Sequence, residues 1–141
     1  MIVLAYDHGA YNMFKKIKEY LDKKGLKYTE CASKELDPLD NFTKFGKMAN
    51  SKVLKGNIGI YGCRSGIGMS MVSNRQKGIR GALCFNEKIA EMSRLHNDAN
   101  ICIIPCDYLS FSKVKKIIDK FLSTGFLGGK YQTRVEELDV E

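Results

Sequence analysis

The chain alternates between short, nearly continuous apolar runs and longer segments in which apolar residues recur every three or four positions. Short apolar runs bounded by turn residues are typical of buried strands, and the wider spacing is typical of amphipathic helices. The pattern predicts five strands, at 2–6, 26–31, 58–63, 79–85 and 99–104. It predicts helices at 10–21 (closed by Gly25), 42–53, 67–74, 87–95 and 110–122.

Strands and helices therefore alternate along the whole chain, with no repeat and no low-complexity linker. This alternation, with strands that are apolar throughout, indicates a parallel sheet covered on both faces. We expect an α/β fold: a three-layer α/β/α sandwich with a five-stranded parallel sheet, Rossmann-like, forming a single domain over 1–141. At 141 residues the chain is long enough to bury a sizeable core.

The chain has a formal net charge of +7. Its lysines are spread over the outer faces of the predicted helices, and no basic run is interleaved with aromatic residues. This distribution favours solvated helix faces over a nucleic-acid site. A positive field would still favour a small anionic substrate.

No apolar run reaches membrane-spanning length, and the chain enters its first strand without a basic leader, so we expect a cytoplasmic protein. The five cysteines are an odd number and contain no C-x-x-C pair, which makes a disulfide framework or a zinc site an unfavoured reading. Several of them lie in apolar runs, where a free thiol behaves as a small hydrophobe.

The most distinctive stretch runs from Ile58 to Ser70, where a buried strand passes through Cys63 into a glycine-rich turn and a helix. The unpaired amides of a first helical turn and the helix dipole together form an anion site. A thiol at that position is expected to ionise more easily than in water. The sequence thus offers an anion site with Cys63 as a candidate base beside it.

Ligands of such sheets bind beyond the carboxyl ends of the strands. We place three groups there: Asp7-His8 after the first strand, the loop 63–68 after the third, and His96-Asn97 at the close of the fourth helix. Each could have an ordinary role, as a helix cap, a carbonyl partner or a core residue. Their expected meeting at one edge of the sheet favours a functional site.

These residues resemble one known family. Its blocks are matched in order and spacing by the following segments: Asp7-His8, Cys63-x-Ser65-Gly66-Ile67-Gly68-Met69-Ser70, Gly78-Ile79-Arg80, Leu83-Cys84, Ser93-Arg94-x-His96-Asn97-Asp98-Ala99-Asn100, and a tail from Phe121 to Val135 containing Gly128-Gly129-Lys130-Tyr131-Gln132-x-Arg134. The chain is similar to ribose-5-phosphate isomerase of type B, a family that includes galactose- and allose-phosphate isomerases. The resemblance covers Met1 to about Glu137.

The resemblance implies interconversion of ribose 5-phosphate and ribulose 5-phosphate, a step of the pentose phosphate pathway, through an enediol and without metal or cofactor. By this resemblance Cys63 is the base between C1 and C2, and the amides of 64–68 (Arg64, Ser65, Gly66, Ile67, Gly68) hold the oxyanion, a large contribution to such catalysis. Ser65 assists at the same oxygens. The resemblance also assigns ring opening to His96, substrate binding to Asn97, proton shuttling to Asp7 and phosphate binding to His8.

The sequence departs from the family at the phosphate end. Of three positions that are usually arginine, only Arg134 is retained, while Lys130 keeps the charge without the bidentate fork and Asp107 reverses it. Arg64 stands where glycine is usual, and it either compensates for Asp107 or points to solvent. An Asp-Tyr-Pro segment of many relatives reads Asn41-Phe42-Thr43 here.

Members of the family form homodimers, sometimes tetramers, with shared active sites, and the polar segment 125–141 is expected to be an arm that packs on a partner subunit. We expect a small sugar phosphate as the ligand, with no nucleic-acid or membrane partner. The alternatives are an allose- or galactose-6-phosphate isomerase, a sugar-phosphate-binding relative without catalysis, and a thiol redox protein based on Cys63. The last is the least favoured because no resolving cysteine is near in sequence.

Overall fold

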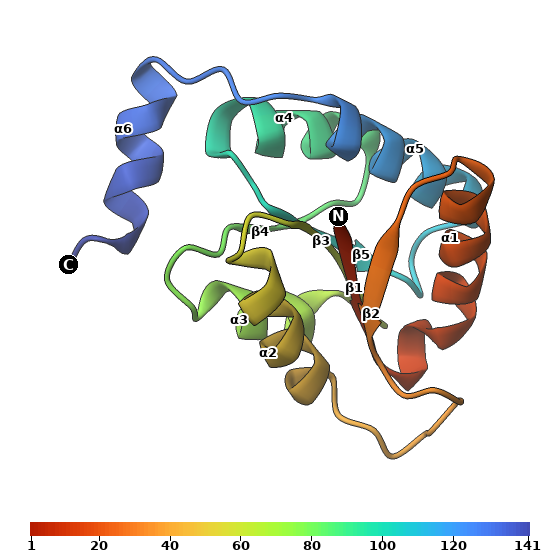
Figure 1. Cartoon of the computed structure of the whole chain (residues 1–141). Coiled ribbons are helices and arrows are strands. Elements are labelled where there is room, and N and C mark those ends of the chain that lie inside the picture. The colour runs from red at the N-terminus through yellow and green to blue at the C-terminus, as the bar shows by residue number, and fades with distance from the viewer.

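In the computed structural model, which describes all 141 residues, five strands lie side by side in the order β2-β1-β3-β5-β4 (Figure 1). Every neighbouring pair is parallel. The strands are β1 (Ile2–Tyr6), β2 (Tyr28–Cys31), β3 (Ile58–Cys63), β4 (Gly81–Leu83) and β5 (Ile101–Pro105). The predicted five-stranded parallel sheet is confirmed.

Helices cover both faces of the sheet, and this makes the fold three-layered (Figure 1). One face carries α1 (Tyr11–Lys23), α4 (Glu87–Asn97) and α5 (Phe111–Ser123), and the other carries α2 (Phe42–Val53) and α3 (Ile67–Asn74). Successive side chains of a strand point to opposite faces. In β1, for example, Leu4 packs under the first group of helices and Val3 and Ala5 under the second, all fully buried. This double coverage explains why the strands are apolar at nearly every position.

Several element ends differ from the sequence prediction by one or two residues, and three of these differences have a clear physical reason. Strand β4 is shorter than expected because the backbone N–H of Ile79 is used in a turn, donating to the carbonyl of Gln76 at 3.1 Å. Helix α4 runs two residues further, to Asn97, and ends at Asp98, whose left-handed conformation (φ 47°) stops it. Strand β5 includes Pro105 as its last residue, where a missing N–H is tolerated.

The C-terminal segment forms a short helix, α6 (Lys130–Glu136), followed by a 3-10 turn, Glu137–Asp139, and neither contains a buried residue. The segment rests on its own chain: Leu127 N–H donates to the carbonyl of Leu95 at 3.1 Å, and Gly78 N–H donates to Asp139 Oδ2 at 2.8 Å. Its packing on a partner subunit stays a prediction. None of the helices combines the length and the apolar character needed to cross a bilayer.

Candidate active site

Cys63 is the last residue of β3 and is only 6% exposed. Gly66, at φ 77°, lets the chain turn so that α3 begins at Ile67. The turn also needs glycine for space, because a Cβ at Gly66 would lie 2.5 Å from the side chain of Leu83. The hydroxyl of Ser65 accepts the N–H of Ile67 at 3.2 Å. A thiol and the N-terminus of a helix are therefore neighbours, as the sequence predicts.

Asp7 follows β1, which pairs with β3 so that Tyr6 lies opposite Gly62. This register brings Asp7 next to Cys63 at the carboxyl edge of the sheet. The Asp7 side chain caps a 3-10 turn, His8–Ala10, by accepting the N–H of Gly9 at 3.1 Å. Burial raises the pKa of the Asp7 carboxyl. A carboxyl that keeps its proton at higher pH than usual is suited to passing protons between hydroxyl oxygens.

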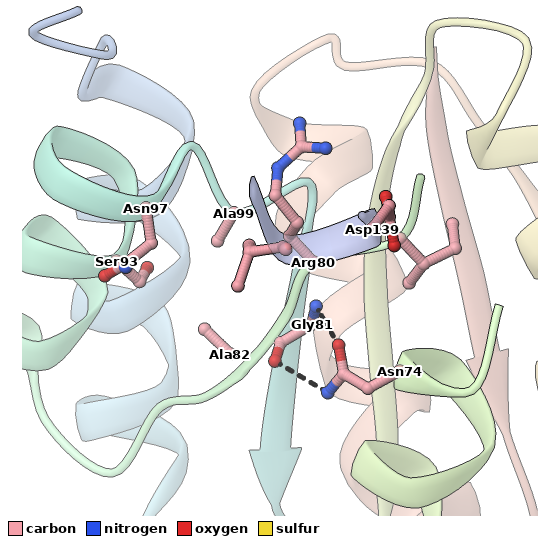
Figure 2. Close-up of a pocket in the computed structure, with 10 residues that line it drawn as sticks. Asn74, Arg80, Gly81, Ala82, Ser93, Asn97, Ala99 and Asp139 are labelled. Atoms are coloured by element: carbon pink, nitrogen blue, oxygen red, sulfur yellow. Dashed lines mark hydrogen bonds between the residues drawn. The ribbon is translucent and has the colours of Figure 1, made fainter. Parts of the chain in front are cut away.

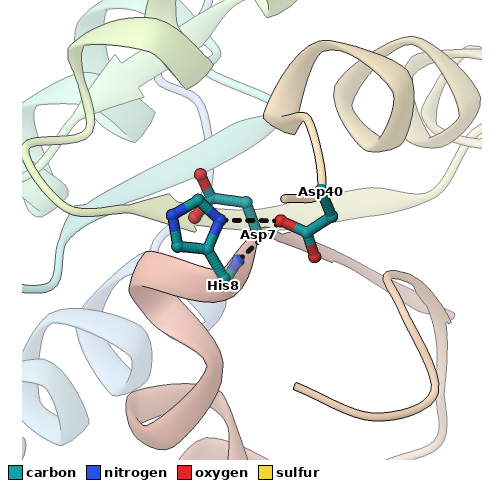
Figure 3. A group of neighbouring side chains, drawn as sticks. All are labelled: Asp7, His8 and Asp40. Carbon is teal, nitrogen blue, oxygen red and sulfur yellow. Dashed lines mark hydrogen bonds and ion pairs between the residues drawn. The ribbon is translucent and has the colours of Figure 1, made fainter. Parts of the chain in front are cut away.

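Asp40 joins this edge from the loop between β2 and α2 (Figure 3). Its Oδ1 accepts both the backbone N–H and Nδ1 of His8, each at 2.9 Å, and its Oδ2 accepts the Ser33 hydroxyl at 3.0 Å. The sequence shows Asp40 only as one acid of a polar loop, and no local signal links it to a histidine 32 residues away. Side-chain atoms of Asp7, His8 and Asp40 lie within 4.8 Å of one another, which is a possible cation ligand set.

Arg64 lies along the site and pairs with Asp107, with 3.4 Å between Nη1 and Oδ2. The aliphatic part of Arg64 covers Gly9, where a Cβ would meet it at 2.5 Å. Arg64, Asp107, His8 and Lys16 all line a cavity of about 310 Å³. Asp107 therefore faces the expected phosphate end, and its charge is opposed by Arg64.

Cys106 supplies a second thiol near this edge, which the sequence reading did not foresee. Its N–H donates to the carbonyl of Cys63 at 3.1 Å. The two side chains nevertheless belong to opposite faces of the sheet, Cys106 packing with the α1 and α5 side and Cys63 with the α2 and α3 side. Burial raises the pKa of the Cys106 thiol. The Cys106 thiolate is disfavoured, which argues against a redox pair with Cys63.

The expectation that His96 and Asn97 share this edge within one chain is wrong. A helix that connects parallel strands runs back to the amino ends of the strands, and α4 ends just before β5 begins at Ile101. Ile101 pairs with Gly59 at the start of β3, whereas Cys63 pairs with Pro105 at the other end. His96 and Cys63 therefore lie at opposite ends of the strands.

His96 instead belongs to a second cluster, formed with α6. Its ring stacks on Tyr131, with 4.4 Å between the centroids and 13° between the planes. Lys130 Nζ and Arg134 Cζ lie 5.3 and 5.6 Å from the centroid of the same Tyr131 ring. The predicted site residues are thus divided into two groups, one around Cys63 and one around His96.

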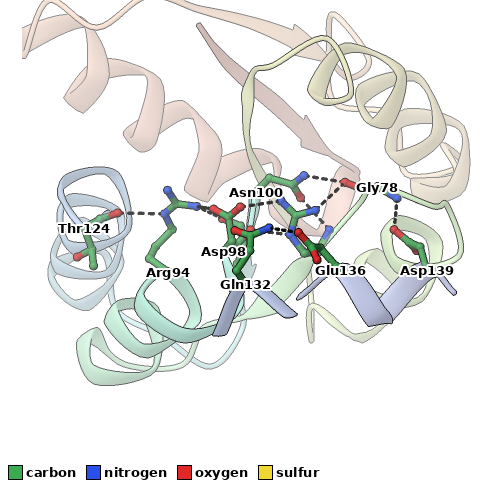
Figure 4. A network of polar contacts seen from close by, with 10 residues as sticks. Gly78, Arg94, Asp98, Asn100, Thr124, Gln132, Glu136 and Asp139 are labelled. Carbon is green, nitrogen blue, oxygen red and sulfur yellow. Dashed lines mark hydrogen bonds and ion pairs between the residues drawn. The ribbon is translucent and has the colours of Figure 1, made fainter. Parts of the chain in front are cut away.

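An ion-pair network holds the end of α4 next to His96 (Figure 4). The carboxylate of Asp98 pairs with Arg94 at 3.2 Å and with Arg80 at 3.1 Å. The amide of Asn100 accepts Arg80 N–H at 2.8 Å and donates to the carbonyl of Gly78 at 2.9 Å. These members of the family motif therefore position the segment that carries His96 and Asn97.

Another cavity, of about 450 Å³, lies away from Cys63, beside β4 and the C-terminal segment (Figure 2). Two of its polar side chains, those of Asn74 and Arg80, are bound within the chain. The Asn74 amide donates to the carbonyl of Gly81 at 3.0 Å and accepts the Gly81 N–H at 2.8 Å. The Arg80 guanidinium is bound to Asp98. The edge that carries Cys63 is therefore the candidate active site.

Fold and site together define an α/β protein with a helix N-terminus beside a thiol at the carboxyl end of a central strand. A family model described as Ribose/Galactose Isomerase matches residues 2–138, and the chain belongs to this family. A "Putative sugar phosphate isomerase" of Rickettsia bellii is 39% identical over 139 residues, covering 98% of this chain and 96% of the relative.

Two solved structures are closely similar. Ribose 5-phosphate isomerase B of Thermotoga maritima has a TM-score of 0.94 at 34% identity, with 98% of this chain and 96% of that chain covered. Ribose-5-phosphate isomerase B of Mycoplasma genitalium, solved with bound ribulose 5-phosphate, has a TM-score of 0.93 at 31% identity, with 97% and 92% covered. The chain thus shares its whole fold with isomerases of sugar phosphates.

Proposed function

We propose that this protein interconverts ribose 5-phosphate and ribulose 5-phosphate through an enediolate, with Cys63 as the base that carries the proton between C2 and C1. The observation that carries this proposal is the position of Cys63 at the end of β3, with the N-terminus of α3 beginning just beyond the left-handed Gly66. Amide donors at a helix N-terminus stabilise negative charge that develops on a substrate oxygen.

The neighbouring residues take roles that match their surroundings. The backbone of 64–68 binds the enediolate oxygens, with help from the Ser65 hydroxyl. Asp7, whose pKa is raised by burial, moves protons between the O1 and O2 oxygens. His8 and Arg64, in the cavity of about 310 Å³, bind the phosphate end.

The second cluster completes the site from another subunit in this proposal. His96 opens the sugar ring as an acid, Asn97 binds substrate, and Lys130 and Arg134 bind phosphate. Because these residues lie at the opposite end of the strands from Cys63 in their own chain, we place the partner's cluster over Cys63 in a homodimer. A two-fold axis would build two equivalent sites in this way.

A six-carbon sugar phosphate, such as allose 6-phosphate or galactose 6-phosphate, is the second candidate substrate. Galactose 6-phosphate is favoured by the family description, which names galactose beside ribose. The reaction type and the roles of Cys63 and the oxyanion loop are the same for both candidates. Five free thiols support a reducing compartment such as the cytoplasm.

The test is to follow ketose formation from ribose 5-phosphate and from allose 6-phosphate with wild type and Cys63→Ala. Loss of a general base is expected to lower kcat by about 10²–10⁴-fold. Cys31→Ala is the matched control, because Cys31 also ends a parallel strand of the sheet, β2, and has no role in the proposal. Its turnover should remain close to wild type.

Equal turnover by Cys63→Ala and wild type would overturn the base assignment. Binding of both sugar phosphates by wild type without turnover would overturn the enzymatic proposal and favour a binding protein.

A further inference from the structure

The loop between β2 and α2 turns one carboxylate inward. Residues 34–39 of this loop are all exposed, yet the side chain of Asp40 is only 7% exposed. A buried carboxylate needs hydrogen-bond partners to offset its desolvation, and Asp40 finds three donors. Two of them belong to His8 and one to Ser33. His8 is therefore the main partner of this carboxylate.

The geometry of this contact constrains the His8 ring. A single oxygen, Asp40 Oδ1, accepts the backbone N–H and Nδ1 of the same residue, each at 2.9 Å. A carboxylate only accepts, so Nδ1 must carry the proton. Figure 3 shows Nδ1 turned toward Asp40 and the other ring nitrogen turned away from it. The His8 ring is 28% exposed and lines the cavity shared with Arg64 and Asp107.

We infer that Asp40 is a positioning residue, which holds His8 in the Nδ1–H form and leaves Nε2 to meet the phosphate end of the substrate. The inference on His8 stands on the contacts alone, and its consequence for turnover rests on the proposed function. A hydrogen bond at one nitrogen of an imidazole determines which nitrogen is available for the other partner. Nε2 can then accept from a sugar hydroxyl or, when the ring is protonated, donate to a phosphate oxygen.

A purely structural role for Asp40 would be to tether the loop. Ser33 and Asp37 separate the two roles. Ser33 binds the same carboxylate without touching His8, and Asp37 Oδ1 accepts the N–H of Leu39 at 2.9 Å within the exposed part of the loop. Ser33→Ala and Asp37→Ala therefore weaken the loop and leave the contact between Asp40 and His8 in place.

The first test is the tautomer of His8, measured by ¹⁵N–¹H NMR of the imidazole groups in the full chain at a pH where the ring is neutral. The chain has two histidines, and the signal that disappears in His8→Gln is that of His8. We expect wild type, Ser33→Ala and Asp37→Ala to show protonated Nδ1. Asp40→Asn should keep it, because its amide oxygen can accept both donors. Asp40→Ala should lose it. The same tautomer in wild type and in a folded Asp40→Ala would overturn the inference.

The second test is kinetic, on the sugar phosphate that wild type turns over. Asp40→Ala should lower kcat/KM by about tenfold, mainly through KM, because one oriented hydrogen bond to the substrate is lost. Asp40→Asn should retain most of the wild-type kcat/KM, and Ser33→Ala should have the kcat/KM of wild type. An unchanged KM in Asp40→Ala would overturn the link to substrate binding. If wild type turned over no sugar phosphate, the proposed function would fail, whereas the NMR result would still decide the role of Asp40.

Discussion

The carboxyl group of Asp7 lowers the stability of the fold at neutral pH and has a chemical role in the proposed function. It is 8% exposed and accepts the backbone N–H of Gly9. Burial opposes its ionisation, and the nearby charge of Asp40 adds to this effect, while His8 acts in the opposite direction. In the proposed mechanism, Asp7 is the proton carrier next to Cys63, and this role would explain why an acid stands at the edge of the core.

Asp7→Asn should therefore make the protein more stable at neutral pH. A raised pKa in the folded state means that Asp7 contributes stability below its ordinary pKa of 3.8, and that this contribution is lost as pH rises through the raised value. Asparagine avoids that loss, and its oxygen can still accept the N–H of Gly9. Urea unfolding at several pH values measures the difference.

The advantage of Asp7→Asn should shrink as the pH falls toward 3.8, and turnover should fall in the same variant because asparagine cannot carry a proton. A wild type that is more stable than Asp7→Asn at neutral pH would contradict the expectation.

The part of the site formed by neighbouring residues of the chain could be predicted from the sequence. Contacts between residues that only the fold brings together could not. The order of Cys63, Gly66 and Ile67 already implies a thiol before a turn and a helix. Asp40 gave no such signal, since its partner His8 lies on a different strand connection. The pairing of Arg64 with Asp107 likewise spans 43 positions, and the sequence left open whether Arg64 points to solvent.

Among the elements, α4 ends in a network of polar contacts. Asp98 adopts a left-handed conformation and bridges Arg80 and Arg94, whose side chains are 22% and 16% exposed. Ion pairs that are partly withdrawn from solvent contribute more than surface pairs, and removing one partner leaves the other cations unpaired. The segment that carries His96 should be the first to loosen when this bridge is broken.

Asp98→Ala should destabilise the protein by about 1–3 kcal/mol, because it removes the acceptor of two arginines and places alanine at a positive φ. Chemical denaturation measures the change in the free energy of unfolding. Glu91→Ala provides the control: Glu91 pairs with the exposed Lys88 on the same helix, and its loss should cost less than about 1 kcal/mol. Equal effects of the two substitutions would contradict the special role of Asp98.

The hydrophobic pattern predicted the main elements because each one buries an apolar stripe or run. The same reasoning could not find α6, since none of its residues is buried and its sequence has no apolar stripe. It also overestimated the length of β4. The apolar residues on either side are buried without belonging to the strand: Ile79 lies in the preceding turn and Cys84 lies just beyond the end of the strand. Burial and strand pairing are different properties, and periodicity reports only the first.

For the whole molecule, the division of the site into two clusters follows from the direction of the chain. Each connecting helix returns to the amino ends of the strands, so His96 at the close of α4 cannot share an edge with Cys63 at the close of β3. The sequence placed both at one edge because it shows the order of the elements without their direction. In the proposed homodimer the two clusters meet across the two-fold axis.

Mixing two inactive variants tests this arrangement. Cys63→Ala and His96→Gln should each be inactive as homodimers, but a hybrid dimer contains one site with both residues intact. With random exchange of subunits, half the dimers are hybrids with one working site, so about a quarter of wild-type activity should return. Hybrids identified by two affinity tags that remain inactive would contradict a shared site.

The side chain of Asn74 protects an edge of the sheet against pairing with other chains. Its amide binds Gly81 through both the N–H and the carbonyl, as a neighbouring peptide group would. β4 is an outer strand of the sheet, and an open outer strand is where foreign peptides add on and aggregation starts. The side-chain amide of Asn74 already pairs with the N–H and the carbonyl of Gly81, as a neighbouring strand would. An incoming strand must therefore break these two hydrogen bonds before it can pair with β4 at Gly81.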